Sequence, residues 1–228
     1  MKHPHVKQLS SEMEQFYLGI QQCNFHLNAS FSANLGSQQY WFQQDPLPRQ
    51  VIHGDKIREG NNQLSKHFLT HQFVYTIRPD IGVCSIASPT TLLGCLSGNI
   101  PPVPLLWEET VREFGLSIPL LPYEKWTNDL CNSEIERFLQ KSDVVCIPYV
   151  GVLIVGGSFG QVLYRLQLIE RLSQMMIIVK QIGKGTVLTP FQAQSLIPNG
   201  RRPSSPNHKS EDIYTSQQTN QSDDWERW

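Results

Sequence analysis

Apolar and polar positions alternate along this chain with two periods, one typical of helices and the other of strands. From Phe159 to Gln181 apolar residues recur every three or four positions, which predicts one long helix with a packed stripe. The stripe consists of Val162, Leu166, Ile169, Leu172, Met176 and Val179. The charged residues of this segment, Arg165, Glu170, Arg171 and Lys180, are expected on its solvated face. Directly upstream, Val144–Ile147 and Val150–Val155 are almost continuously aliphatic, which indicates central strands covered on both faces.

Segments with the same two periods fill most of the remaining chain. A helix is expected over Glu12–Leu27, and Asn28–Phe42 alternates loosely around Gly36-Ser37, as a β-hairpin does. Further helices are expected at Gln63–Ile77, Thr90–Ser97, Trp107–Phe114, Glu134–Gln140 and after Thr189, and short strands around Val51-Ile52, at Ile81–Ile86 and at Ser117–Leu121. A chain of this length fits one domain with a substantial core, which we place over residues 1–198.

Composition and charge narrow the class of protein. The 228 residues carry 19 basic and 20 acidic side chains, so no strong net field recruits nucleic acid or an acidic membrane. The most apolar stretch, residues 144–155, is interrupted by Pro148 and Gly151 and is too short to span a bilayer. The N-terminus has no apolar run after its basic residues, and the 5 cysteines lack zinc-ribbon or redox spacing, which favours a reduced cytoplasmic protein.

The C-terminal residues 199–228 differ in composition from the rest of the chain. They are polar, contain prolines and are poor in aliphatic residues, so they are expected to form a disordered tail. The tail carries Ile213-Tyr214, Trp225 and Trp228, and we consider docking of these residues onto a partner or a neighbouring subunit.

One ordered series of signals lies between Tyr75 and Pro89. Arg78-Pro79 ends a helix, a buried strand follows, and Ser88-Pro89 begins the next helix, with Ser88 expected as its cap. This series resembles the class II aldolase/adducin family, and a second similarity lies in residues 143–155. The resemblance implies an α/β fold, a three-layer α/β/α sandwich around a central mixed, largely antiparallel sheet.

The resemblance also identifies what this sequence lacks. Family enzymes place a His-x-His pair in the strand before Ser-Pro, and a third histidine before the glycine that opens the last strand. These histidines hold a divalent metal that polarises a sugar carbonyl. We assign the corresponding positions here to Ser85, Ala87 and Val150, and none of these side chains replaces imidazole at such a site. We therefore expect no metal and no other cofactor. In a retired site Val150 and Ala87 would face each other, with Tyr149 or His67 filling the old cavity.

Two histidines in the helix before Arg78 are further candidates. His67 and His71 are one turn apart, a spacing that permits a shared zinc ion, but no third ligand lies nearby and a packed, structural role is favoured. The resemblance places His67 at the position of the family's acid/base glutamate. It also places Ser30 at the end of a pair that helps to bind substrate phosphate.

Two classes of function remain open. A non-catalytic member would keep the fold for assembly or interaction, as the resemblance to adducin allows. The alternative is a sugar-phosphate aldolase or epimerase that uses a relocated divalent metal such as zinc, or a catalytic paralogue in a hetero-oligomer. The resemblance implies an oligomer in either case, a homotetramer or an assembly with a paralogous subunit.

Overall fold

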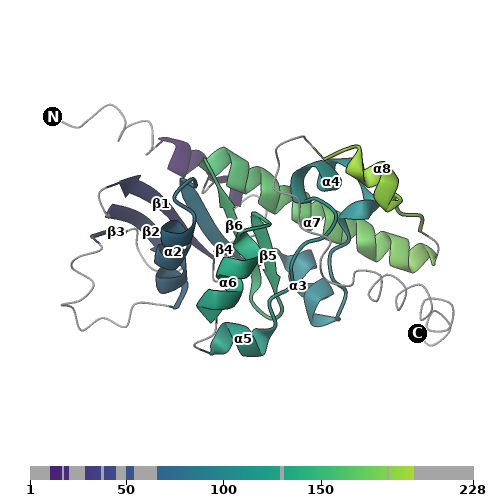
Figure 1. The fold of residues 1–228 in the computed structure, drawn as a ribbon, viewed down its shortest axis with the longest axis horizontal. Helices are drawn as coiled ribbons and strands as arrows, with labels where there is room; N and C mark the ends of the chain where they lie inside the picture. The colour runs from purple at the N-terminus through teal and green to yellow at the C-terminus, as the bar shows by residue number, and fades with distance from the viewer. Residues whose placement is uncertain are drawn as a thin grey trace.

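A six-stranded sheet in the order β3-β2-β1-β4-β6-β5 runs through the molecule (Figure 1). The computed structural model describes residues 11–16, 18–20, 29–36, 39–44, 50–53, 66–128, 131–183 and 185–197, and the tail 199–228 lies outside these ranges. The strands are β1 (Ser30–Gly36), β2 (Gln39–Gln44), β3 (Gln50–His53), β4 (Val83–Ala87), β5 (Val144–Ile147) and β6 (Gly151–Gly156). All pairings between these strands are antiparallel, and an isolated parallel bridge between Leu120 and Cys146 makes the sheet mixed.

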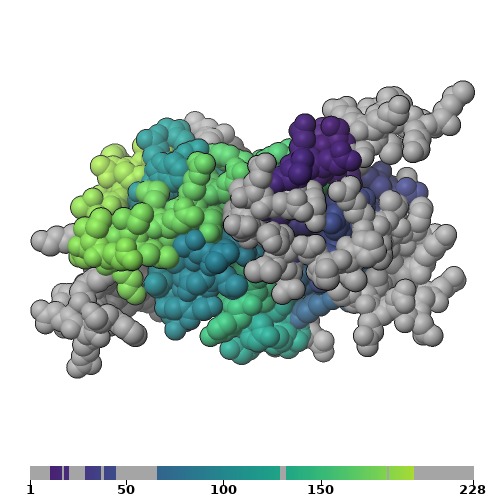
Figure 2. All heavy atoms as spheres, turned by 180° about the vertical axis from the view of Figure 1, so that it is seen from behind, coloured from purple at the N-terminus to yellow at the C-terminus, as the bar shows by residue number. Residues whose placement is uncertain are grey.

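Helices cover both faces of the sheet. On one face lie α2 (Lys66–Ile77), α5 (Tyr123–Thr127) and α6 (Cys131–Leu139), which pack on alternate residues of β4, β5 and β6. On the other lie α3 (Thr90–Ser97), α7 (Phe159–Ile182) and the helical residues 11–16 and 18–20. Figure 2 views the molecule from this second side. The 3-10 turn η2 (Pro104–Leu106), α4 (Glu108–Phe114) and α8 (Pro190–Gln194) form a smaller cluster at one end. The expected three-layer α/β/α sandwich is therefore confirmed.

Helix α7 confirms the long apolar stripe and corrects its polar face. Val162, Leu166, Ile169 and Leu172 are fully buried, as the period of the sequence requires. Arg165 and Glu170 were expected in solvent but are 3% and 9% exposed. Both are buried because each has partners on other elements, which a one-dimensional pattern does not reveal.

The partner of Glu170 is the start of helix α3. The Glu170 carboxylate accepts hydrogen bonds from the backbone amides of Thr91 (2.9 Å) and Leu92 (3.0 Å). Amides in the first turn of a helix have no acceptor within the helix, so these two would otherwise be unpaired. Ser88 was expected to cap this helix, but its hydroxyl instead donates to the carbonyl of Val150 at 2.6 Å. The cap of α3 therefore comes from α7.

Arg165 belongs to a network of ion pairs centred on Asp143, at the start of β5. The two oxygens of Asp143 accept from Arg165 (2.9 Å) and from Arg78 at the end of α2 (3.0 Å). Arg165 also binds Glu113 of α4 at 2.6 Å and the carbonyl of Val155, and Arg78 donates to the carbonyl of Leu139 at 2.7 Å. The network thus connects both helical layers to the same end of the sheet.

Two further segments differ from expectation. Residues 117–121 contribute only the bridge at Leu120 instead of a strand, and the short helix α5 follows where no helix was expected. No helix in the described part of the chain is long and apolar enough to cross a membrane.

Candidate functional site

Three polar side chains, four residues apart on α2, face two serines of β1. His71 lies between the serines, with Nε2 3.0 Å from Ser30 Oγ and Nδ1 2.6 Å from Ser32 Oγ. His67 Nδ1 lies 3.1 Å from Ser30 Oγ, and the Tyr75 hydroxyl lies 2.8 Å from Ser32 Oγ. Tyr75 also donates to the carbonyl oxygen of Ser32 at 2.8 Å. The contacts form one unbroken chain from His67 to Tyr75.

Burial sets the protonation states of the titratable side chains in this hydrogen-bonded series. His71 is 1% exposed, and loss of hydration together with the neighbouring His67 holds its pKa well below the usual value for histidine. Burial, followed by the charge of Lys66, also lowers the pKa of His67, which is only partly exposed. Burial raises the pKa of Tyr75 well above the ordinary range. All three groups are therefore neutral near pH 7.

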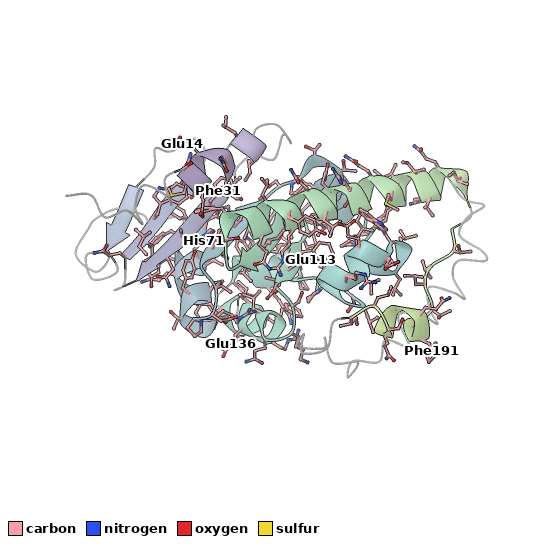
Figure 3. All side chains as sticks on the ribbon, turned by 90° about the horizontal axis from the view of Figure 1, so that it is seen from above. Glu14, Phe31, His71, Glu113, Glu136 and Phe191 are labelled. Carbon is pink, nitrogen blue, oxygen red and sulfur yellow. The ribbon has the colours of Figure 1, made fainter. Side chains whose placement is uncertain are left out.

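The candidate positions in β4, Ser85 and Ala87, lie on the opposite face of the sheet from the hydrogen-bonded side chains of α2 and β1. Val83 and Ala87 belong to the core under α7, and Cys84 and Ile86 belong to the core under α2. Because side chains alternate along a strand, Ser85 lies with Val83 and Ala87 and points away from His67. In Figure 3, Phe31, the β1 partner of Ser85, lies toward α7, whereas His71 lies toward α2.

This placement corrects the assumed grouping of Ser85 and Ala87 with His67. A displacement of one residue along a strand moves every side chain to the other face. A His-x-His pair that shares a face with His67 would occupy residues 86 and 88, which here are Ile86 and Ser88. Neither of these side chains supplies an imidazole.

The turn before β6 holds the remaining candidates. Val150 is partly buried against the core under α2, so the expectation that it faces Ala87 is wrong. Tyr149 does not fill a cavity, since it is 64% exposed and its ring contacts that of Tyr123 at 5.6 Å. Tyr149 has φ 63° and Gly151 has φ 124°, and a Cβ at Gly151 would lie 2.1 Å from the Ala87 carbonyl oxygen. The close approach of the turn to β4 therefore requires glycine at 151.

The donor set does not fit the divalent metal that the family resemblance implies. Within the described ranges, no group of three or more His, Cys, Asp or Glu side chains could hold an ion. His67 Nδ1 and both nitrogens of His71 are engaged with serine hydroxyls. Cys84, on the same face as His67, is fully buried, and burial raises the pKa of its thiol far above the usual value. The described residues therefore provide no site for the ion.

The structure thus brings Ser30, His67 and His71 together and separates them from Ser85, Ala87 and Tyr149. Ser32 and Tyr75 were missed as members of the same chain of contacts. Spacing alone could have identified them, because Ser30 and Ser32 are two residues apart on a strand and His67, His71 and Tyr75 are four apart on a helix.

Solved structures show the same fold at low sequence identity. YgbL from Klebsiella pneumoniae, a proposed aldolase/epimerase/decarboxylase, has a TM-score of 0.69 at 14% identity, over 83% of this chain and 98% of its own. L-fuculose 1-phosphate aldolase from Glaciozyma antarctica PI12 has a TM-score of 0.65 at 12% identity, over 99% of this chain and 95% of its own. An aldolase II superfamily protein from Pseudomonas syringae has a TM-score of 0.68 at 12% identity, over 95% and 94%. No curated protein matches the sequence of this chain.

The family assignment is carried by the sequence itself. The profile described as Class II Aldolase and Adducin N-terminal domain matches residues 44–177, which are more than half of the 228 residues. This range begins at the end of β2 and extends into α7, and it includes the helix that presents His67 and His71 and the strands β4, β5 and β6. The chain therefore belongs to the class II aldolase and adducin N-terminal domain family.

Proposed function

We propose that this protein is a non-catalytic member of its family that acts in assembly or interaction. The carrying observation is that Ile86, on the face that His67 shares, is 1% exposed inside the apolar core. A metal-binding imidazole in place of Ile86 would have to fit into closely packed apolar surroundings. The two histidines of this site, His67 and His71, are hydrogen-bonded to serines, which fits a structural role.

A second candidate is a sugar-phosphate aldolase or epimerase completed by another subunit. One observation favours it: His67 Nε2 makes no hydrogen bond within the described part of the chain. L-fuculose 1-phosphate aldolase, one of the structural neighbours, gives the type of reaction that such an assembly would carry out. A paralogous subunit would have to supply the metal ligands in that case.

Assembly is also supported by exposed apolar side chains at the end of α7 and on α8. Ile178 is 54% exposed, Ile182 68% and Phe191 85%. Exposed apolar side chains mark a contact surface where they form a contiguous patch, and we propose that these three contribute to one. We propose a homotetramer, or an oligomer with a paralogous subunit, and light scattering that shows a monomer stable to dilution would contradict both.

Metal content tests the non-catalytic proposal directly. The full chain, purified without a histidine tag and analysed for zinc, manganese and cobalt, should contain none in stoichiometric amount. The matched variant His67→Ala/His71→Ala should be indistinguishable from the parent in this measurement. One ion per parent chain that is lost in the double variant would overturn the proposal and favour the enzyme.

A pair of reconstructed variants tests the geometry behind the proposal. Ile86→His/Ser88→His/Val150→His places the imidazoles on the face of the sheet that α2 covers, whereas Ser85→His/Ala87→His/Val150→His sends two of them under α7. Both should melt below the parent, because imidazoles enter apolar space. Only the first should gain thermal stability when zinc is added. Zinc stabilisation of the second alone would show that the assignment of faces is wrong.

A further inference from the structure

The hydrogen-bonded chain between β1 and α2 allows every proton in it to be assigned by counting. Tyr75 has one hydroxyl hydrogen and donates it to the carbonyl of Ser32, so its 2.8 Å contact with Ser32 Oγ must be donated by the serine. The hydrogen of Ser32 is then used, so the 2.6 Å contact with His71 must be donated by His71 Nδ1–H. Neutral His71 accordingly carries its lone pair on Nε2.

The same count assigns the donors in the remaining hydrogen bonds, between His71, Ser30 and His67. Ser30 must donate to His71 Nε2 at 3.0 Å, which uses its only hydrogen. The 3.1 Å contact between Ser30 and His67 must therefore be donated by His67 Nδ1–H, which leaves the lone pair of His67 on Nε2. In this single arrangement every hydroxyl donates once and every imidazole is neutral.

The two histidines differ in what an added proton does. His67 can accept a proton at Nε2 and continue to donate to Ser30 from Nδ1. A proton on His71 would turn Nε2 into a second donor to Ser30, and the hydroxyl hydrogen of Ser30 would lose its acceptor. A buried donor without an acceptor and a buried cation are both costly.

Among the residues that the structure describes, none that faces His71 compensates for such a charge. The titratable groups facing it and the adjoining Tyr75 are His67, with Lys66 beside it, on α2, Tyr40 on β2 and Cys84 on β4. The ring of Phe42 on β2 lies edge-on to the imidazole, 5.5 Å between centroids. No carboxylate of the described residues is among these neighbours, and the positive charge nearby would repel a second one.

We propose that the hydrogen-bonded side chains of Ser30, Ser32, His67, His71 and Tyr75 form an acid-sensitive clasp. The clasp holds the first part of α2 on β1 while His71 is neutral and releases it when His71 is protonated. The second part of α2 is fixed independently, since Val74 belongs to the apolar core and Arg78, directly after the helix, binds Asp143. The first part is held by the clasp, by the contact of Phe68 with Phe42, and by the contacts of Lys66 and His67 with the ring of Trp126 on α5. Release therefore begins at His67 and His71, before the sheet unfolds.

Two measurements on the full chain test the clasp. Imidazole nitrogen NMR near pH 7.5 should show the Nδ1–H form for both His67 and His71, assigned with His67→Gln and His71→Gln. Hydrogen exchange of the amides of residues 68–73, corrected for intrinsic rates, should reveal an opening constant that rises up to about tenfold per pH unit below pH ~6.5. The amides of β4 should not follow that rise.

The variants separate the two histidines. His71→Gln should remove the proton that His71 takes up on opening, because an amide can donate to one serine and accept from the other without titrating. His67→Gln should retain the proton taken up by His71. An unchanged dependence in His71→Gln, an Nε2–H form of His71, or opening of residues 68–73 only together with β4 would each overturn the proposal. If His71→Gln does not fold, the tautomers and the parent's exchange profile still decide it.

Discussion

Replacing Asp143 by asparagine should remove the charge that two arginines share at the start of β5. Asparagine keeps the shape of the side chain, but one of its two oxygens becomes an NH2 donor that faces a guanidinium group. The side chain of Arg165 is 3% exposed and that of Arg78 11%, whereas that of Asp143 is 28% exposed. In the variant, the positive charges of Arg78 and Arg165 therefore stay buried without the negative charge that they share in the parent.

The expected loss of stability can be bounded from the contacts that remain. Removing one partner of a buried ion pair costs about 3–5 kcal/mol. Arg165 retains Glu113 and the Val155 carbonyl, and Arg78 retains Asp80 and the Leu139 carbonyl, so we expect the lower end. A loss of about 3 kcal/mol corresponds to a fall in Tm of roughly 6–12 °C for a domain of this size.

Urea unfolding followed by circular dichroism is a suitable assay, with Glu108→Gln as the control. Glu108 pairs with Arg112 on α4, and both side chains are more than half exposed, at 57% and 52%. Such exposed pairs contribute about 0.2–1 kcal/mol. If Asp143→Asn costs no more stability than Glu108→Gln, the ion-pair network around Asp143 does not stabilise the fold.

Three further expectations follow from other contacts. Glu170→Gln should destabilise the protein by about 1–3 kcal/mol, because a charged acceptor for two amides becomes neutral, and exchange of the Thr91 and Leu92 amides should accelerate. Gly151→Ala should cost more than about 3 kcal/mol, beyond the usual effect of a point mutation, since its Cβ would overlap the Ala87 carbonyl and φ is 124°; Gly36→Ala, with open space around its Cβ, is the control in a thermal melt. Because the pKa of His71 is lowered in the fold, the unfolded chain binds its proton first as pH falls, so the contribution of His71 to stability should be constant above about pH 6.5 and decrease below it by up to about 1.4 kcal/mol per pH unit, measured as the difference between the parent and His71→Gln in urea titrations.

Local periodicity was enough to predict most elements. The stripe of α7 repeats with the helical period, and the aliphatic runs of β5 and β6 are short and bounded by Pro148 and glycines, as in strands covered on both faces. The hairpin of β1 and β2 was visible from the turn at Gly36, which has φ 81°. These signals depend on neighbours in sequence, which is why they can be read directly from the chain.

Interactions between distant residues could not be predicted in this way. Arg165 and Glu170 have the pattern of solvent-facing residues on α7, and their partners are 52 and 79 residues away. The face of β4 was misassigned because a one-residue shift leaves the apolar pattern of a strand buried on both sides unchanged. Where both faces are covered, hydrophobicity does not distinguish them, and the structure was needed to separate Ser85 from His67.

The isolated bridge at Leu120 has a consequence for how copies of this chain can associate. Cys146 of the edge strand β5 receives a hydrogen bond from the amide of Leu121 at 2.8 Å and donates its own to the carbonyl of Pro119 at 2.9 Å. Beyond this segment, an incoming strand would meet Pro119 and Pro122, which have no N–H, so that of residues 119–122 only Leu120 keeps an amide outside the pairing. Strand addition, the usual route by which an open sheet edge recruits another chain, is therefore blocked at β5. Contact with a neighbouring molecule at this edge has to be made through side chains such as Tyr123 and Tyr149, which restricts it to partners of matching shape.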